Sequence, residues 1–170
     1  MAKSEVRGRK RKRQSFGNDE IITLENVSKA YATGAPALNG VDLRIRRGEF
    51  VFIVGDSGSG KSTMIKLLLR ELIPTSGNIN VMGYDLVHIR HRKIPKFRRN
   101  LGIVFQDFRL LKDRNVYENV AFAQRIIQAS NKEIKRNVPS ILATVGLAGK
   151  YKAKPRQLSG GEQQRVAIAR

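Results

Sequence analysis

The stretch "FVFIVGDSGSGKST" (Phe50–Thr63) joins a nearly all-apolar run to a glycine-rich turn and a Lys-Ser pair. Gly55 to Ser62 fits the pattern G-x-x-x-x-G-K-[ST]. The apolar run Phe50–Val54 predicts a strand buried on both faces of a parallel sheet. The pattern from Ser62 to Leu72 predicts a helix. A strand, a glycine loop and a helix in this order are the context in which the motif cradles phosphates.

The residue types in this loop match that chemistry. Gly55, Gly58 and Gly60 allow the backbone to wrap closely, so that successive N–H groups point at an anion. The following helix presents its positive N-terminal end to the same anion. Lys61 supplies a positive charge to the β- and γ-phosphates, and the hydroxyl of Ser62 can ligate Mg²⁺. The sequence therefore predicts a nucleoside-triphosphate site.

Outward from this motif, strand patterns dominate the first half of the chain and helical patterns the second half. A turn is expected at Arg47–Gly48, and Pro139 predicts a kink or a new helix start. The organisation predicts an α/β core with a helical insertion, as one compact unit. A strand followed by a turn is expected in Glu20–Tyr31. The other expected strands are one from Val41 to the turn, Asn78–Gly83 and Leu101–Gln106, and the helical region is Val116–Leu147.

Composition limits the class of protein. The 170 residues are 41% hydrophobic, which is enough for a core, and no apolar run reaches the ~18 residues that span a bilayer. The absence of cysteine excludes disulfides and thiolate metal sites and fits a cytosolic protein. The net charge of +19 predicts an anionic partner of some kind.

Two segments carry much of this basic charge. Lys3–Arg13 holds seven basic residues and Glu5, and we expect it to be a disordered tail. It can be a solvated tail, a contact with anionic lipid or a contact with nucleic acid. "HIRHRKIPKFRRN" (His88–Asn100) can be a solvated face or a contact surface.

Three further features lie before or after the loop and could belong to the same site: Tyr31, Gln106 and the segment Leu158–Arg170. Tyr31 lies in a predicted turn and can stack on a base, although a lone tyrosine is more often structural. Gln106 ends a predicted strand and can reach a γ-phosphate or a metal-bound water, although a lone glutamine at a strand end is more often structural. "LSGGEQQRVAIAR" (Leu158–Arg170) begins as a helix does, with Ser159 before two glycines and Glu162 three residues later.

Together these segments resemble the nucleotide-binding domain of ABC ATPases. "SKAY" resembles the adenine-stacking loop, "GDSGSGKST" the Walker A motif, "VFQD" the Q-loop and "LSGGEQQRVAIAR" the signature. The resemblance implies an α/β P-loop NTPase fold with a RecA-like core, a β-subdomain and a helical subdomain. The implied domains are a tail at 1–19 and a partial nucleotide-binding domain at 20–170. Within the latter, 107–157 is mostly the helical subdomain and 158–170 the signature segment.

The resemblance also implies roles for individual residues. Tyr31 stacks on adenine, Gln106 senses the γ-phosphate and couples the site to a membrane subunit, and Ser62 and Gln106 ligate Mg²⁺. The signature residues contact ATP held by a second copy, so that the working unit is a homodimer with ATP sandwiched between the copies. The implied ATP-binding residues are Tyr31, Gly55, Asp56, Ser57, Gly58, Ser59, Gly60, Lys61, Ser62, Thr63, Gln106, Ser159, Gly160 and Gly161.

Within that superfamily, "LGIVFQDFRLLKDRNVYENVAF" (Leu101–Phe122) and "RKIPKFRRN" (Arg92–Asn100) most resemble the FtsE family of cell-division ATPases. This implies an FtsX-like membrane subunit and a peripheral location at the cytoplasmic face of the plasma membrane. Two alternatives stay open: the ATPase subunit of an exporter or lipoprotein-release system, and a soluble ABC-type protein that binds nucleic acid.

The family pattern continues with a Walker B strand, a catalytic Glu, a D-loop and a switch His, and the sequence shows none of them. The only histidines, His88 and His91, precede Gln106. The resemblance thus places the catalytic residues beyond Arg170 and implies a fragment or truncated gene product, with a naturally short regulatory form as the alternative. For the 170-residue chain itself we expect weak ATP binding and negligible hydrolysis, because phosphoryl transfer relies on positioned groups that are missing.

Overall fold

The computed structural model describes residues 19–32, 34 and 36–170. The basic segment Lys3–Arg13 lies outside the described residues. The chain forms two compact units, the first ending at Ile94 and the second beginning at Pro95. Each unit has its own buried residues and is described by itself.

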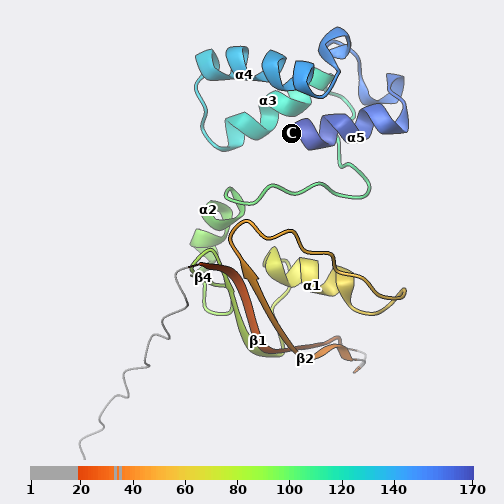
Figure 1. Cartoon of the computed structure of the whole chain (residues 1–170). Helices are drawn as coiled ribbons and strands as arrows, with labels where there is room; N and C mark the ends of the chain where they lie inside the picture. The colour runs from red at the N-terminus through yellow and green to blue at the C-terminus, as the bar shows by residue number, and fades with distance from the viewer. Residues whose placement is uncertain (1–18, 33, 35) are drawn as a thin grey trace, which may run out of the picture. The chain divides into compact units, whose positions relative to one another are not determined.

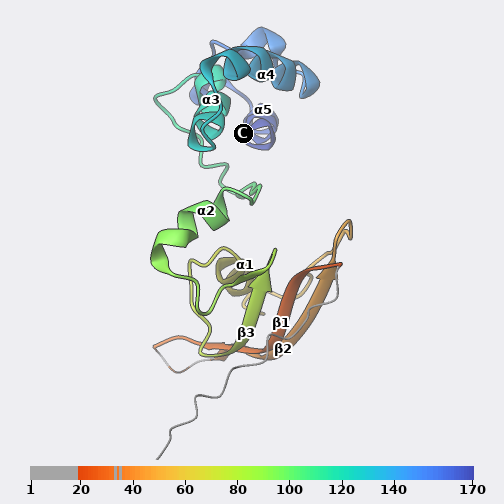
Figure 2. The same cartoon turned by 90° about the vertical axis from the view of Figure 1, so that its left-hand side faces the viewer.

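Four strands form one antiparallel sheet in the first unit, in the order β2-β1-β3-β4 (Figure 1 and Figure 2). Leu24 of the central strand β1 pairs with Leu43 on one side and with Ile79 on the other. Leu24, Val27 and Ile79 are buried, and this apolar interior holds the sheet together. The strands are β1 (Glu20–Ala30), β2 (Pro36–Arg46), β3 (Ser76–Val81) and β4 (Tyr84–Asp85).

Helix α1 (Lys61–Leu68) lies on one side of this sheet (Figure 2). It begins directly after Gly60, and its Leu67 is fully buried. The helix predicted at Ser62–Leu72 is therefore present but ends earlier, and residues 69–72 form turns. The turn predicted at Arg47–Gly48 is also present.

The strands predicted at Phe50–Val54 and Leu101–Gln106 are wrong for this structure, because neither segment has strand geometry. Phe50 and Val54 are each 85% exposed, whereas a strand buried on both faces was expected. A strand exists only where a neighbouring strand accepts and donates its backbone hydrogen bonds. Within the described part of the chain, no strand pairs with either segment, so the apolar pattern alone does not produce one.

Short helical turns lead into the second unit: η1 (His91–Lys93) belongs to the first unit, and α2 (Ile94–Arg98) crosses the boundary. The second unit is a small helical bundle in which α4 runs across α3 and α5 (Figure 1). Its remaining helices are α3 (Val116–Ile126), α4 (Asn131–Thr144), η2 (Ala148–Lys150), η3 (Pro155–Gln157) and α5 (Gly160–Ala169).

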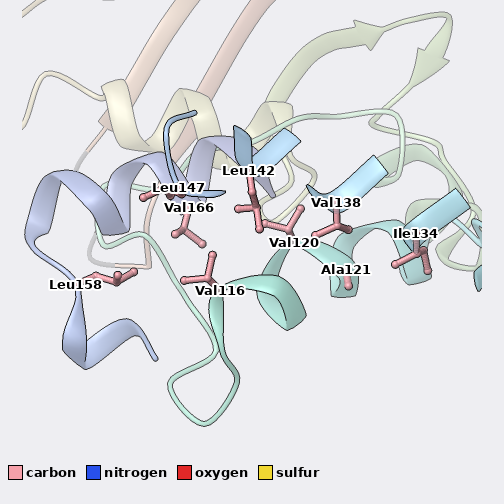
Figure 3. Packing of buried hydrophobic residues seen from close by; sticks show 9 residues of the cluster. All are labelled: Val116, Val120, Ala121, Ile134, Val138, Leu142, Leu147, Leu158 and Val166. Atoms are coloured by element: carbon pink, nitrogen blue, oxygen red, sulfur yellow. The ribbon is translucent and has the colours of Figure 1, made fainter. Parts of the chain in front are cut away.

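The core of this bundle is a single apolar cluster (Figure 3). Helix α3 contributes Val116 and Val120, α4 contributes Val138 and Leu142, and α5 contributes Val166, each at most 1% exposed. The helical spacing of these residues explains why three short helices fold against one another. The helices that the sequence predicted between Val116 and Leu147 are thus confirmed.

Pro139 lies inside α4 and does not begin a new helix. Its missing N–H removes one hydrogen bond from the helix interior. The neighbouring residues Val138 and Leu142 are buried in the core, and this packing favours a continuous helix. Among the helices of the described residues, none is long and apolar enough to cross a membrane.

Candidate functional site

The glycine loop between residue 55 and helix α1 has a backbone that requires its glycines. Gly58 and Gly60 have φ values of 86° and 92°, in the left-handed region that favours glycine. A Cβ atom on Gly60 would lie 2.3 Å from the carbonyl oxygen of Ala37 and 2.8 Å from the Leu38 side chain. The loop can therefore approach strand β2 only because Gly60 has no side chain.

The ammonium group of Lys61 lies within this loop. It donates hydrogen bonds to the carbonyl oxygens of Gly55 (2.7 Å) and Asp56 (2.6 Å) and to the hydroxyl of Ser59 (3.3 Å). These partners are neutral acceptors, and Lys61 makes no ion pair within the described residues. Its positive charge is therefore positioned by the loop without being neutralised, which suits an anionic ligand.

Tyr31 lies beside the same loop. Its hydroxyl is 3.0 Å from the hydroxyl oxygen of Thr63, which is buried near the start of α1. Tyr31 is 42% exposed, so part of the residue is open to a ligand. The sequence predicted Tyr31 and Thr63 as separate site residues, and the structure brings them into contact.

Tyr31, Lys61 and Thr63 all line one cavity of about 350 Å³. This volume falls in the range of small-molecule sites. Four loop residues predicted for the site are exposed in the loop but do not line the cavity: Gly55, Asp56, Ser57 and Ser59. The lining residues are Tyr31, Pro36, Ala37, Gly58, Gly60, Lys61, Ser62 and Thr63.

Gln106 belongs to the second unit, where it is exposed at the start of a turn. The next residues hold the turn: the Arg109 guanidinium lies 3.9 Å above the Phe105 ring, and its Nε is 3.4 Å from Asp107. Arg170, at the end of α5, donates a 2.6 Å hydrogen bond to the carbonyl oxygen of Arg109. The turn after Gln106 is thereby tied to the helix that carries the signature.

Sequence reasoning missed Asn119, which holds the loop between this turn and α3. Asn119 is fully buried, and its amide oxygen accepts a 2.7 Å hydrogen bond from the N–H of Leu111. Its amide nitrogen donates to the carbonyl oxygens of Leu111, Arg114 and Asn115. The available signal was a polar residue three positions after Val116, on the apolar side of a predicted helix.

The signature residues form the N-terminus of α5. The Ser159 hydroxyl accepts a hydrogen bond from the N–H of Glu162, and the Glu162 carboxylate accepts one from the N–H of Ser159 (2.8 Å). This hydrogen bond from the Ser159 backbone, aided by Lys150 at 3.4 Å, holds the pKa of Glu162 below its usual range. Gly160 and Gly161 are exposed, so the helix end predicted from the sequence is accessible to an anion.

Ser62 and Gln106, the two residues implied as Mg²⁺ ligands, belong to different units. Among the residues that the structure describes, no group of three or more His, Asp or Glu side chains could hold a metal ion. Mg²⁺ commonly takes one or two protein oxygens and completes its shell with water and substrate phosphates. The hydroxyl of Ser62 at the cavity fits that type of binding.

The second unit also contains a larger groove, of about 690 Å³. It is bounded by the segment after Gln106, by the segment before the signature and by one residue of α5. Its charged side chains are mainly basic. The lining residues are Asp107, Phe108, Arg109, Leu110, Lys112, Asp113, Lys154, Pro155, Arg156 and Gln163.

Comparison with known protein sequences gives consistent matches. A family described as "ABC transporter" matches residues 38–170. The cell division ATP-binding protein FtsE of Mycobacterium tuberculosis is 52% identical over 151 residues, which are 88% of this chain and 66% of that protein. The proteins of the same name from Streptococcus pneumoniae and Escherichia coli are 47% and 48% identical over 88% of this chain, and the match covers 65% and 68% of them. The chain spans slightly less than two thirds of the first two relatives.

Solved structures agree with this result. A dimeric ATP-binding cassette in a post-hydrolysis state, bound to ADP and Pi, superposes with a TM-score of 0.78 at 38% identity. That match covers 87% of this chain and 67% of the cassette. The cbiO1 protein of Clostridium perfringens, part of an ABC transporter complex, gives a TM-score of 0.79 at 33% identity over 89% of this chain and 60% of that protein.

Proposed function

Because the chain belongs to the ABC transporter family, we propose that it is the ATP-binding part of an ABC-type membrane complex that acts in cell division. The observation that carries this proposal is the loop around Lys61, whose ammonium is held by Gly55, Asp56 and Ser59 beside the cavity that Tyr31 lines. The relatives named FtsE support the division role.

In this proposal the cavity holds ATP. Tyr31 receives the adenine ring, and Lys61 with the backbone N–H groups of the loop binds the phosphates. The Ser62 hydroxyl would help to hold Mg²⁺, which would supply neutralisation of phosphate charge when bound. The left-handed backbone of Gly58 and Gly60 supports this assignment, because it gives the loop a curvature that residues with a side chain rarely adopt.

The proposed working unit is a homodimer. Ser159, Gly160 and Gly161 provide an exposed helix N-terminus, where unpaired N–H groups favour an anion. We assign to them the γ-phosphate of ATP bound by the second copy, and to Gln106 the sensing of the γ-phosphate. The similar cassette solved as a dimer with ADP and Pi supports this arrangement.

The proposed membrane partner is an FtsX-like subunit, which would hold the chain at the cytoplasmic face of the plasma membrane. The groove that follows Gln106 is large enough to receive a short segment of such a partner. We propose ATP hydrolysis for the whole protein rather than for the 170-residue chain. None of the residues assigned above is a candidate for polarising the attacking water.

Equilibrium binding of a fluorescent ATP analogue to the 170-residue chain tests the nucleotide site. Lys61→Ala should weaken binding about tenfold or more, because charge-assisted hydrogen bonds contribute roughly 1.5–3 kcal/mol. Lys66→Ala is the matched control, since Lys66 is exposed on the same helix and does not line the cavity. Equal affinities of the two variants would refute the assignment.

Copurification from cells tests the partner. The wild-type protein should bring down an FtsX-like membrane protein, and Lys61→Ala should still do so if docking uses the groove of the second unit. Recovery of a permease with a substrate cavity instead would favour the exporter alternative. A soluble ribonucleoprotein or DNA complex would favour the nucleic-acid alternative.

A further inference from the structure

The segment from Arg90 to Arg99 has an unusual charge. Six of its ten residues are Lys or Arg, and His91 adds a titratable group. The chain has no Asp or Glu between Asp85 and Asp107, so the positive charge is not balanced locally. The six basic residues are Arg90, Arg92, Lys93, Lys96, Arg98 and Arg99.

These side chains are exposed to solvent. Within the described residues, five of them make neither an ion pair nor a side-chain hydrogen bond: Arg90, Arg92, Lys93, Lys96 and Arg99. The nearest acidic side chain in sequence, Asp85, is taken by the ring of His88 at 2.8 Å and by two backbone N–H groups. The charge of these five residues is therefore available to an external anion.

The backbone that carries this charge is ordered. The N–H of Lys93 donates to the carbonyl oxygen of Arg90, and the segment continues through η1 into α2 (Figure 1). Phe97 is fully buried and Ile94 is half-buried, while the basic residues of the segment are exposed.

The chemistry of the segment distinguishes between anionic partners. Single-stranded nucleic acid is bound by aromatic side chains that stack on bases, and the one aromatic residue here, Phe97, is buried. Duplex DNA is read by a helix in the major groove, and α2 has only five residues. A cluster of four to eight Lys and Arg residues next to a membrane is typical of binding to anionic lipid headgroups.

We propose that the segment Arg90–Arg99 is a docking surface for an anionic lipid bilayer. The segment binds lipid phosphates directly, without a membrane protein as intermediary. This surface is distinct from the ATP cavity and does not depend on the proposed ATP binding. It would bind a bilayer through many weak contacts rather than one headgroup in a pocket.

Sedimentation with vesicles tests the proposal on the chain that begins at Gln14, so that the tail does not contribute. Vesicles with roughly 30% phosphatidylglycerol should bind at low salt, and pure phosphatidylcholine vesicles should not. Replacing Arg90, Arg92, Lys93 and Lys96 by Gln should lower the partition coefficient by at least about tenfold, because each cation near such a surface contributes about fivefold.

The control replaces four exposed basic residues elsewhere, Lys132, Lys135, Arg136 and Lys152, by Gln and removes the same net charge. It should retain most of the binding, because the proposal assigns no bilayer contact to these four residues. An equal loss of vesicle binding in both variants would show that the bilayer attracts any positive charge on the chain. That result would overturn the proposal. Unchanged circular dichroism and urea unfolding verify that the variants fold.

Two further outcomes would also overturn it. Displacement of the chain from vesicles by a low concentration of glycerol phosphate would reveal a site for a single phosphate. Displacement of the chain from vesicles by duplex DNA, at a phosphate concentration below that of the anionic lipid, would reveal a nucleic-acid surface. We expect neither competitor to act at concentrations that leave vesicles intact and the ionic strength unchanged.

Discussion

Gly60 is the residue whose substitution should most perturb the phosphate loop. Gly60→Ala would place a methyl group 2.3 Å from the Ala37 carbonyl oxygen at a φ of 92°. The left-handed backbone alone costs roughly 1–2 kcal/mol for alanine, and forced overpacking adds about 1–3 kcal/mol. Gly58→Ala is the control, because its Cβ would meet nothing within 4 Å at a similar φ. Urea unfolding should show a clearly larger loss for Gly60→Ala, and equal losses would refute the close approach.

Tyr31 allows the ring and the hydroxyl to be tested separately. Tyr31→Phe removes only the hydrogen bond to Thr63 and should cost about 0.5–1.5 kcal/mol of stability. It should leave the affinity for the ATP analogue nearly unchanged. Tyr31→Ala should also weaken nucleotide binding, because stacking of an aromatic ring on a base contributes roughly 1–3 kcal/mol. If Tyr31→Phe weakens binding as much as Tyr31→Ala, the hydroxyl rather than the ring serves the ligand.

The residues of the loop were predictable because each has a chemical reason that is visible in the sequence. The spacing of Gly55, Gly60 and Lys61 specifies a backbone shape and a charge. The contact between Tyr31 and Thr63 was not predictable, since it joins residues 32 positions apart. Asn119 was missed for the same reason: its four hydrogen bonds depend on how a loop folds back on a helix.

At the scale of elements, α4 and α5 offer a matched pair of helix caps. Ser130 and Ser159 each cap a helix and exchange hydrogen bonds with a glutamate three residues later. Ser130→Ala and Ser159→Ala should each cost about 0.5–2 kcal/mol of stability. Only Ser159→Ala should also weaken ATP-dependent dimerisation of the whole protein, measured by light scattering. An equal effect of Ser130→Ala on dimerisation would attribute the loss to helix stability alone.

The same caps predict a pH dependence. Hydrogen bonds from Ser130 lower the pKa of Glu133, and those from Ser159 lower the pKa of Glu162. A carboxylate with a lowered pKa in the folded state stabilises the fold above the ordinary pKa of about 4.5 and loses this effect as the pH falls through the lowered pKa. Glu133→Gln with Glu162→Gln should therefore lose less stability between pH 6 and pH 3.5 than the parent. A variant with Glu25→Gln and Glu71→Gln controls for the charge change, and an identical pH profile for both pairs would contradict the prediction.

The helices and three of the predicted strands are present, as β1, β2 and β3, whereas two predicted strands that found no pairing partner are not. The cap at Ser159 and the apolar spacing of Val116 and Val120 are local, and the helices they predict are present. The apolar run Phe50–Val54 predicts a strand only if other strands pair with it. Within the described residues none does, so the segment is exposed even though its sequence favours a buried strand.

At the scale of the whole molecule, the α/β class and the P-loop fold expected from the sequence are confirmed by the similarity to solved ABC cassettes. The division at Ile94 and Pro95 was not readable from the sequence. No linker composition marks it, and the boundary falls inside a helix whose residues look continuous. Two separate sets of buried residues define the units instead.

The buried residues of the two units can be perturbed separately. Leu24 is 1% exposed in the sheet of the first unit, and Leu142 is 1% exposed in the helical core of the second. Replacing either by Ala should cost about 2–5 kcal/mol, because each change removes buried methyl groups and leaves a cavity. Amide hydrogen exchange should accelerate most in the unit that carries the substitution. Because the cavity beside Lys61 is built on the first unit, Leu24→Ala should weaken binding of the ATP analogue and Leu142→Ala should not. Equal weakening by both would show that the nucleotide site depends on the core of the second unit as much as on its own.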